Sequence, residues 1–291
     1  MVRILAPRLP SPFAALCLAL ALACRAAASE PVAVADAAAV ARHLGALGFV
    51  ALDHTLAQWG AVPRTRLSGP GTAAAWRERV PFRGSVYLRL ALSAVLQANE
   101  ALIATRARVR SLVPARAGLV DRVWLVALSS DYGIAAGESM PVADLRSALL
   151  HRLDALPPSL VIAKGALDSG WLPSRHVRAD GPEFGRWTLG RLTAASTDGA
   201  GFRDPRAALK AYMNHLNADD AFAAMRDARA RLRGQGRALD GHALAVHLAP
   251  ALGRRATQHL LRIIRNNGLK RLDRARLAAG PAIEFRRIAG R

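Results

Sequence analysis

The sequence contains few of the residues that crosslink a chain or bind soft metals. Its 291 residues include two cysteines, Cys17 and Cys24, and both lie within the first 28 positions. Removal of that segment would leave a chain without a thiol, which excludes a disulfide and a thiolate metal site. Aromatic residues make up only 5% of the chain. Because alanine and leucine dominate the apolar residues instead, the composition favours helix over sheet.

The sequence signatures of several enzyme classes are also missing. There is no Walker phosphate loop, no G-x-G-x-x-G, no H-E-x-x-H and no G-x-S-x-G nucleophile elbow. These absences point away from nucleotide-dependent chemistry and from zinc proteases. A Ser-His-Asp set built without that elbow is not excluded by the sequence. We expect no metal and no cofactor.

Acidic residues are scarce relative to basic ones. The chain has 41 Lys and Arg against 21 Asp and Glu, a formal net charge of +20, and only Lys164, Lys210 and Lys270 are lysines. Such a balance predicts attraction to polyanions, namely envelope polymers, anionic lipid or nucleic acid. A specific nucleic-acid reader is the weakest of these, because no recognisable DNA-binding motif or interleaved aromatic residues accompany the charge.

The N-terminus has the pattern of a secretory signal. Arg3 and Arg8 precede an apolar core at residues 13–23, which is too short for a normal membrane span. Ala26–Ala28 offers a cleavage site, so we expect the mature chain to begin at Ser29 and to reach the periplasm or cell envelope. As an alternative, Cys24 is a lipidated cysteine, although alanine stands at Ala21 where a lipobox would have leucine.

The remaining pattern predicts a mainly α protein. Residues 29–80 form an Ala-rich helical leader, with a helix expected at 34–44. Scaffold helices follow at 81–155, a main domain at 156–272 and a basic tail at 273–291. The helices expected from apolar periodicity and turn signals after the leader are 87–110, 119–129, 141–153, 160–168, 205–216, 219–232, one ending near 248, and 254–266.

The stretch 156–187 contains a candidate catalytic carboxylate at the end of a predicted helix. Pro157-Pro158 interrupts the preceding helix, Ser159 is positioned to cap the next one, and Asp168 stands at its end before Gly170. A carboxyl group beside aromatic rings suits proton donation to a glycosidic oxygen, because burial can keep it protonated. The simpler interpretation is that Asp168 only terminates the helix.

Several motifs in a fixed order resemble those of the bacterial Bax-like proteins, which belong to the glucosaminidase-domain family that cuts peptidoglycan. The resemblance extends over roughly residues 81 to 272. The stretches that carry it are Gln97-Ala98-Asn99-Glu100, Pro157-Pro158-Ser159-Leu160, Ala166-Leu167-Asp168-Ser169-Gly170-Trp171, Ser174-Arg175, Phe184-Gly185-Arg186-Trp187 and Ala211-Tyr212-Met213-Asn214-His215-Leu216-Asn217.

The resemblance implies a lysozyme-like arrangement of helices around a cleft, with a small, shortened β element near residues 188–203. It implies a periplasmic peptidoglycan hydrolase of endo-β-N-acetylglucosaminidase type, acting on glycan strands with Asp168 as general acid. The residues expected to contact substrate are Trp171, Phe184, Trp187, Tyr212 and Asp198. Three of the weaker candidates have simpler interpretations: a turn residue for Asp198, a core side chain for Tyr212 and a surface charge for Glu100. Asp204 is either a helix start or a further acid.

The chain departs from the family pattern at three places. Asp168 stands where the family has glutamate, and Leu172 stands where it has glycine. The stretch 247–253 contains no counterpart of the family's Tyr-Ser-x-Arg segment. These differences keep a second function open, that of a glycan-binding or scaffolding protein of the envelope without turnover.

Overall fold

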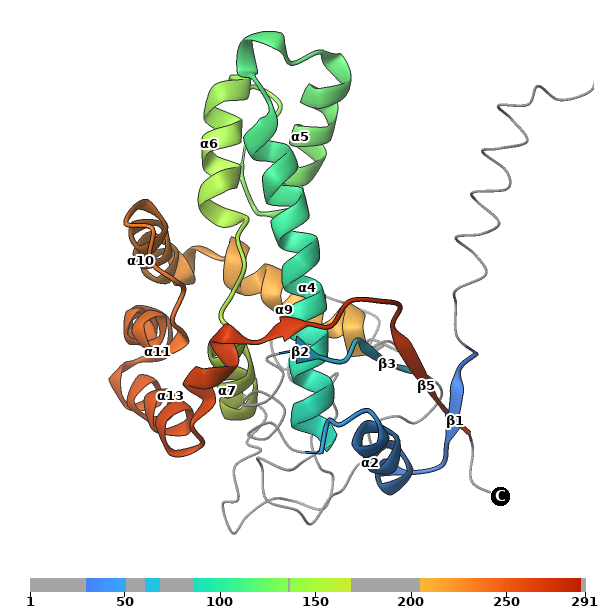
Figure 1. Cartoon of the computed structure of the whole chain (residues 1–291). Helices are drawn as coiled ribbons and strands as arrows, with labels where there is room; N and C mark the ends of the chain where they lie inside the picture. The colour runs from blue at the N-terminus through green and yellow to red at the C-terminus, as the bar shows by residue number, and fades with distance from the viewer. Residues whose placement is uncertain (1–29, 51–60, 69–85, 136, 169–204, 289–291) are drawn as a thin grey trace, which may run out of the picture.

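The computed structural model describes residues 30–50, 61–68, 86–135, 137–168 and 205–288 (Figure 1). These residues are mainly helical, which confirms the fold class expected from the sequence. The helices are α2 (Ala37–Ala46), α4 (Val86–Ser111), α5 (Leu119–Asp131), α6 (Val142–Arg152), α7 (Pro158–Asp168), α9 (Pro205–Ala218), α10 (Ala223–Gly234), α11 (Gly241–Ala245), α12 (Ala249–Leu252) and α13 (Arg254–Asn266), with short 3-10 turns η2 (Pro114–Arg116), η3 (Asp220–Phe222), η4 (Val246–Leu248) and η5 (Leu269–Arg274).

Helix α7 lies at the centre of the main core. Its residues from Leu160 to Ala163, together with Ala166, are buried, so the helix has no solvent face along most of its length. Most residues of this helix are apolar, as expected for a helix in such a position. It contacts α4, α11, α13 and η5, and Figure 1 shows it between α4 and α13. These four elements therefore enclose the helix that ends at Asp168.

The described strands join the two ends of the chain. β1 (Val32–Val34) and β3 (Thr65–Ser68) both pair in parallel with β5 (Ile283–Arg287), in the order β1-β5-β3. A second pair joins β2 (Ala61–Val62) to β4 (Arg276–Leu277). The segment interpreted as a basic tail thus supplies two strands, and Phe285 in β5 is fully buried.

These strands correct two expectations. Strands were expected only near residues 188–203, which lie outside the described residues, and not at the ends of the chain. The helix expected at 34–44 instead begins at Ala37, because Asp36 accepts a 2.7 Å hydrogen bond from the backbone N–H of Ala39 and caps α2. Val34, taken as helical, belongs to β1.

A second, smaller core lies in a projection formed by the end of α4, η2, α5 and α6. Figure 1 shows these helices extending away from the body of the molecule. The buried side chains of the projection form a cluster of their own: Val109, Leu125, Tyr132, Leu145, Leu149 and Leu153.

Candidate functional site

Most of the residues expected at a substrate cleft fall outside the described part of the chain. Trp171, Phe184, Trp187 and Asp198 all lie within 169–204, and so does the expected helix stop at Gly170. The backbone of Asp168 is described as the last residue of α7. The catalytic and substrate-binding roles of these residues stay predictions.

Tyr212 is the one expected substrate contact whose side chain the structure describes. It lies on α9, is 2% exposed and belongs to the main core. Lys164 on α7 is also buried, and its Nζ lies 5.9 Å from the centroid of the Tyr212 ring and 6.0 Å from that of Phe222. These distances are in the range of cation–π contacts. Tyr212 therefore packs beside α7 one helical turn before Asp168.

The N-terminus of α7 is held by a residue that sequence analysis did not select. Asp273, in η5, accepts hydrogen bonds from the Ser159 backbone N–H (2.9 Å), the Ser159 hydroxyl (2.8 Å) and the Gly241 backbone N–H (2.8 Å). Ser159 was expected to cap the helix, but the helix begins at Pro158 and the Ser159 hydroxyl donates to Asp273. The capping carboxylate thus comes from 114 positions further along the chain.

Burial raises the pKa of Asp273 to about 6. The hydrogen bonds from Gly241 and Ser159 act in the opposite direction, and the nearby charge of Asp240 acts in the same direction as burial. A carboxyl group placed at the start of α7 is favoured in its charged form by the helix dipole, yet the loss of water around it outweighs the donors.

Helix α11 approaches the start of α7 too closely for a side chain. A Cβ on Gly241 would lie 2.1 Å from Ser159 Oγ and 2.8 Å from the Leu160 backbone nitrogen. Asp240, directly before Gly241, caps α11 by accepting from the Ala243 N–H. Glycine is needed at 241 because the two backbones meet there.

Two asparagines hold the segment that enters α7, and both belong to the stretches that carry the Bax-like resemblance. Asn99 on α4 donates to the Leu156 carbonyl (2.8 Å) and accepts from the Leu156 N–H (2.9 Å). Asn217 on α9 donates to the Asp154 carbonyl (3.0 Å). Both side chains are buried. Each satisfies backbone groups that have no helical or strand partner there.

A buried charge cluster completes this anchor. Arg229 donates to Asn217 Oδ1 (2.5 Å) and to the Arg152 carbonyl (2.8 Å), and Arg233 makes a bidentate pair with Asp154 at 3.0 and 3.1 Å. Burial alone would raise the pKa of Asp154, but the Arg233 hydrogen bonds and the charges of Arg229 and Arg106 together place it below its usual value. Burial also lowers the pKa of Arg229 to about 10.

Glu100 is half-exposed and forms an ion pair. Arg64 donates to both of its carboxylate oxygens, at 2.6 and 2.7 Å, and also to the Ala278 carbonyl at 2.9 Å. The interpretation of Glu100 as a surface charge agrees with this position, although its partner is Arg64 rather than an arginine of its own helix. Through Arg64 it connects α4 to the leader and to the C-terminal strands.

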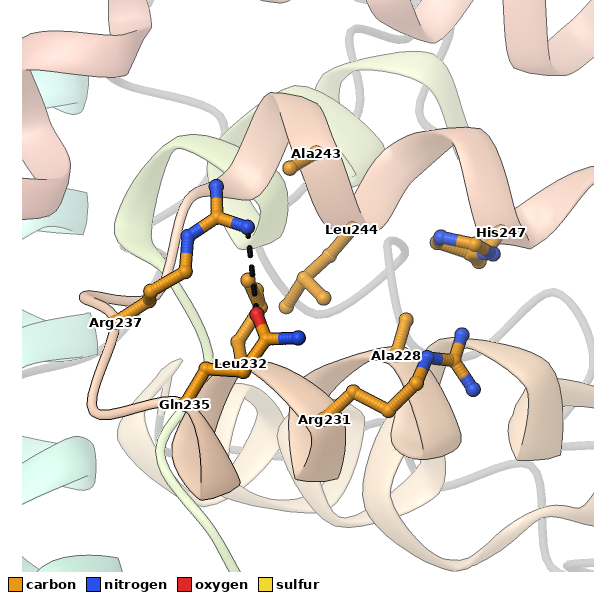
Figure 2. Close-up of a pocket in the computed structure, with 8 residues that line it drawn as sticks. All are labelled: Ala228, Arg231, Leu232, Gln235, Arg237, Ala243, Leu244 and His247. Carbon is orange, nitrogen blue, oxygen red and sulfur yellow. Dashed lines mark hydrogen bonds between the residues drawn. The ribbon is translucent and has the colours of Figure 1, made fainter.

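A pocket of about 250 Å³ lies between α10 and the α11–η4 segment. Figure 2 shows its apolar base and the guanidinium groups at its rim. None of the expected site residues lines it. Because the lining contains no carboxylate, the pocket cannot supply the acid of a glycosidase, although its positive rim would attract an anion. The lining residues are Ala228, Arg231, Leu232, Gln235, Arg237, Ala243, Leu244 and His247.

The described residues contain no group of three or more His, Cys, Asp or Glu side chains that could hold a metal ion. Within the same ranges, no helix is both long and apolar enough to cross a membrane.

Part of the chain is similar to a curated bacterial protein. No family model matches the chain. Protein bax of Escherichia coli (strain K12) is 34% identical to it over 91 residues, which is 30% of this chain and 33% of that protein. This match supports a Bax-like relation. The match thus covers a third of the length of this relative. No solved structure matches the chain.

Proposed function

We propose that the chain is an exported peptidoglycan hydrolase of endo-β-N-acetylglucosaminidase type, with Asp168 as its general acid. Asp168 would protonate the leaving glycosidic oxygen as the sugar ring develops oxocarbenium character. Trp171, Phe184 and Trp187 would form walls of the cleft and exclude water from it. The activity belongs to the family that the motifs resemble, and the relation to Protein bax supports that choice.

The observation that carries the proposal is the convergence of separate motif stretches on one helix. Asn99, Tyr212 and Asn217 come from two stretches far apart in the sequence, and all three contact α7 or the segment that leads into it. A catalytic acid needs a fixed position, because misplacement by about 1 Å can reduce a rate on the order of a hundredfold. Buried, hydrogen-bonded anchors before α7 provide that kind of rigidity.

Placement at a helix end also suits the proposed role. The last turn of a helix carries partial negative charge on its unpaired carbonyls, which disfavours ionisation of a nearby carboxyl group. Asp168 occupies that position on α7. Lys164, one turn earlier, acts in the opposite direction through its charge.

One residue favours a second candidate function. Aspartate is one methylene shorter than the family's glutamate, which withdraws the carboxyl group by roughly 1–1.5 Å. A chain with such an acid could bind glycan strands without cutting them, as an envelope binding or scaffolding protein.

Digestion of purified peptidoglycan, with the released muropeptides analysed by mass spectrometry, tests both candidates. We expect weak hydrolysis by the wild type, none by Asp168→Asn, and equal or greater hydrolysis by Asp168→Glu. Asp227→Asn is the control, because Asp227 is an exposed acid on α10 that has no proposed role. Its activity should equal that of the wild type.

Two outcomes would contradict the proposed hydrolase function. Turnover by Asp168→Asn at the wild-type rate would remove Asp168 from the chemistry. If the wild type and Asp168→Glu both sediment with peptidoglycan yet release no muropeptides, the correct function is glycan binding without hydrolysis.

Export is tested separately, by the intact mass of protein recovered from the cell envelope. Cleavage after Ala28 should give a chain beginning at Ser29. A mass that includes acyl chains on Cys24 would contradict cleavage after Ala28 and would show that the protein is a lipoprotein.

A further inference from the structure

The end of the projection exposes apolar side chains that the fold does not use. Val113 is 53% exposed, Leu119 77%, Val120 78% and Val123 60%. They lie in the turn after α4 and on the first turns of α5, where the chain reverses direction at the outer end of the projection (Figure 1). We call these four residues the apolar tip. Isolated exposed valines are ordinary, but a contiguous group of this kind marks a surface that contacts something.

Three residues of the apolar tip lie on the outer face of α5. Leu119, Val120 and Val123 are spaced i, i+1 and i+4, so they share one side of α5. Leu125 is on the opposite side, fully buried in the small core of the projection. None of the four residues of the apolar tip belongs to that core or to the side chains packed against it.

Arginines flank the apolar tip in the sequence. Between positions 108 and 124 the chain has Arg108, Arg110, Arg116 and Arg122, against Asp121 as the one acid. Arg108 lies over the Trp124 ring at 3.8 Å, and Arg122 donates to the Glu138 carbonyl at 2.6 Å. Within the described ranges none of these four arginines pairs with a carboxylate.

We propose that the apolar tip inserts into the surface of a membrane rich in anionic lipid. Leucine and valine side chains would enter the boundary between headgroups and acyl chains, while the arginines keep their guanidinium groups at the headgroup phosphates through their long apolar stems. The tip is the end of a projection, which is a shape suited to a lipid surface rather than to a partner that needs a groove. This proposal adds a site to the proposed function and does not rest on Asp168.

A fluorescent label at the apolar tip tests the insertion directly. The full chain with Cys17→Ser, Cys24→Ser and Val120→Cys is labelled with an environment-sensitive nitrobenzoxadiazole group and mixed with phosphatidylglycerol vesicles. We expect its emission to rise and shift to shorter wavelength. The matched control carries the label at Val246→Cys, an exposed valine in η4 on the main body, and its emission should not change. Because the label reports on its own position, binding through residues 13–23 does not reproduce this difference.

Charge substitution supplies the second measurement, made on the chain that begins at Ser29 so that residues 13–23 do not contribute to vesicle binding. Leu119→Glu with Val123→Glu should weaken sedimentation with the same vesicles by about tenfold or more, because carboxylates do not enter hydrocarbon. Val246→Glu should leave sedimentation unchanged. Melting temperatures of both variants should match the wild type, since neither position is buried.

Binding should also depend on lipid charge, so vesicles of phosphatidylcholine alone should recover less protein. The proposal is overturned if the labels at 120 and 246 respond equally, or if the double glutamate variant sediments as well as the wild type. It is also overturned if that variant loses self-association in analytical ultracentrifugation but keeps vesicle binding, because the apolar tip would then be a contact between copies of the chain.

Discussion

Around α7 the molecule buries polar side chains that hydrogen-bond to the backbone, whereas at the end of the projection it exposes apolar side chains. Asn99, Asn217 and Asp273 each make at least one hydrogen bond to a backbone group that would otherwise be buried without a partner. Val120 and Leu119 contact little protein at all. Buried polar networks specify one geometry, so the first region fixes the position of a helix. The second region offers a surface.

The two regions are joined by arginines from α4 and α10. Arg106 on α4 donates to the carbonyls of Leu150 and Leu153, where α6 ends, and its Nε lies 3.8 Å from Asp154. Arg229 on α10 reaches the carbonyls of His151 and Arg152. These hydrogen bonds attach the last turn of α6 to the main core. The outer end of the projection takes no part in them.

The largest expected effect is the loss of Asp154. Asp154→Ala removes the buried carboxylate that pairs with Arg233 at 3.0 Å, and with it the negative charge that favours the charged form of the buried Arg229 guanidinium. Breaking a buried ion pair in this way costs about 3–5 kcal/mol of unfolding free energy. Urea denaturation measures the change. Asp227→Ala is the control, because its pair with His151 is exposed and should contribute at most about 1 kcal/mol. Equal effects of the two variants would show that the cluster does not anchor the core.

Asp273 should make the stability of the core depend on pH. Its folded-state pKa of about 6 lies above the ordinary 3.8, a difference equivalent to about 3 kcal/mol. A raised pKa means that the neutral form fits the fold better. Its contribution is therefore complete below pH 4 and is lost as pH rises through 6.

Asp273→Asn removes this titration, and thermal melting between pH 4 and 7 measures the result. The melting temperature of the wild type minus that of the variant should decrease as pH rises through this range. A constant difference would show that Asp273 is charged throughout and acts only as a hydrogen-bond acceptor.

Gly241→Ala tests the close approach of α11 to α7. The added methyl group would overlap Ser159 Oγ and the backbone at Leu160, so the helices must separate, at a cost of about 1–3 kcal/mol. Gly234→Ala is the matched control, because nothing lies within 4 Å of a Cβ at that position. It should be neutral or slightly stabilising. A neutral Gly241→Ala would mean that the contact is adjustable.

The smallest effect is expected at the apolar tip. Leu119→Ser with Val120→Ser should change the unfolding free energy by no more than about 0.5 kcal/mol per residue, because exposed side chains leave no cavity. Leu125→Ala on the same helix should cost about 2–5 kcal/mol. Chemical denaturation of both variants provides the comparison. A large loss of unfolding free energy in the variant at 119 and 120 would show that these side chains stabilise the fold. It would contradict the interpretation of the apolar tip as a contact surface.

Local signals predicted most of the helices. The helix expected at 87–110 is α4 at Val86–Ser111, and the one expected at 254–266 is α13 at those same positions. Proline breaks, glycine stops and apolar residues at helical spacing act within a few positions, so a sequence displays them directly. The same signals placed the start of α7 after Pro157 to within two residues, and they indicated a short, mostly apolar helix.

The contacts that hold α7 were not visible in that way. Asp273 reaches Ser159 across 114 positions, and Asn99 reaches Leu156 across 57. The resemblance selected the stretches around Asn99 and Asn217, but their role as clamps on backbone groups appeared only in the fold. The parallel pairing of β5 with β1 and β3 is equally distant, and strands of two to five residues carry too short a pattern to be recognised.

The sequence by itself determined the helical class of this protein, the extent of its helices and the order of its Bax-like motifs, because each depends on neighbouring residues. Only the tertiary structure decided which carboxylate caps α7, which asparagines clamp its entry and which valines are left outside any core. Those outcomes depend on which distant surfaces meet, and a buried polar group is assigned its partner only when they do.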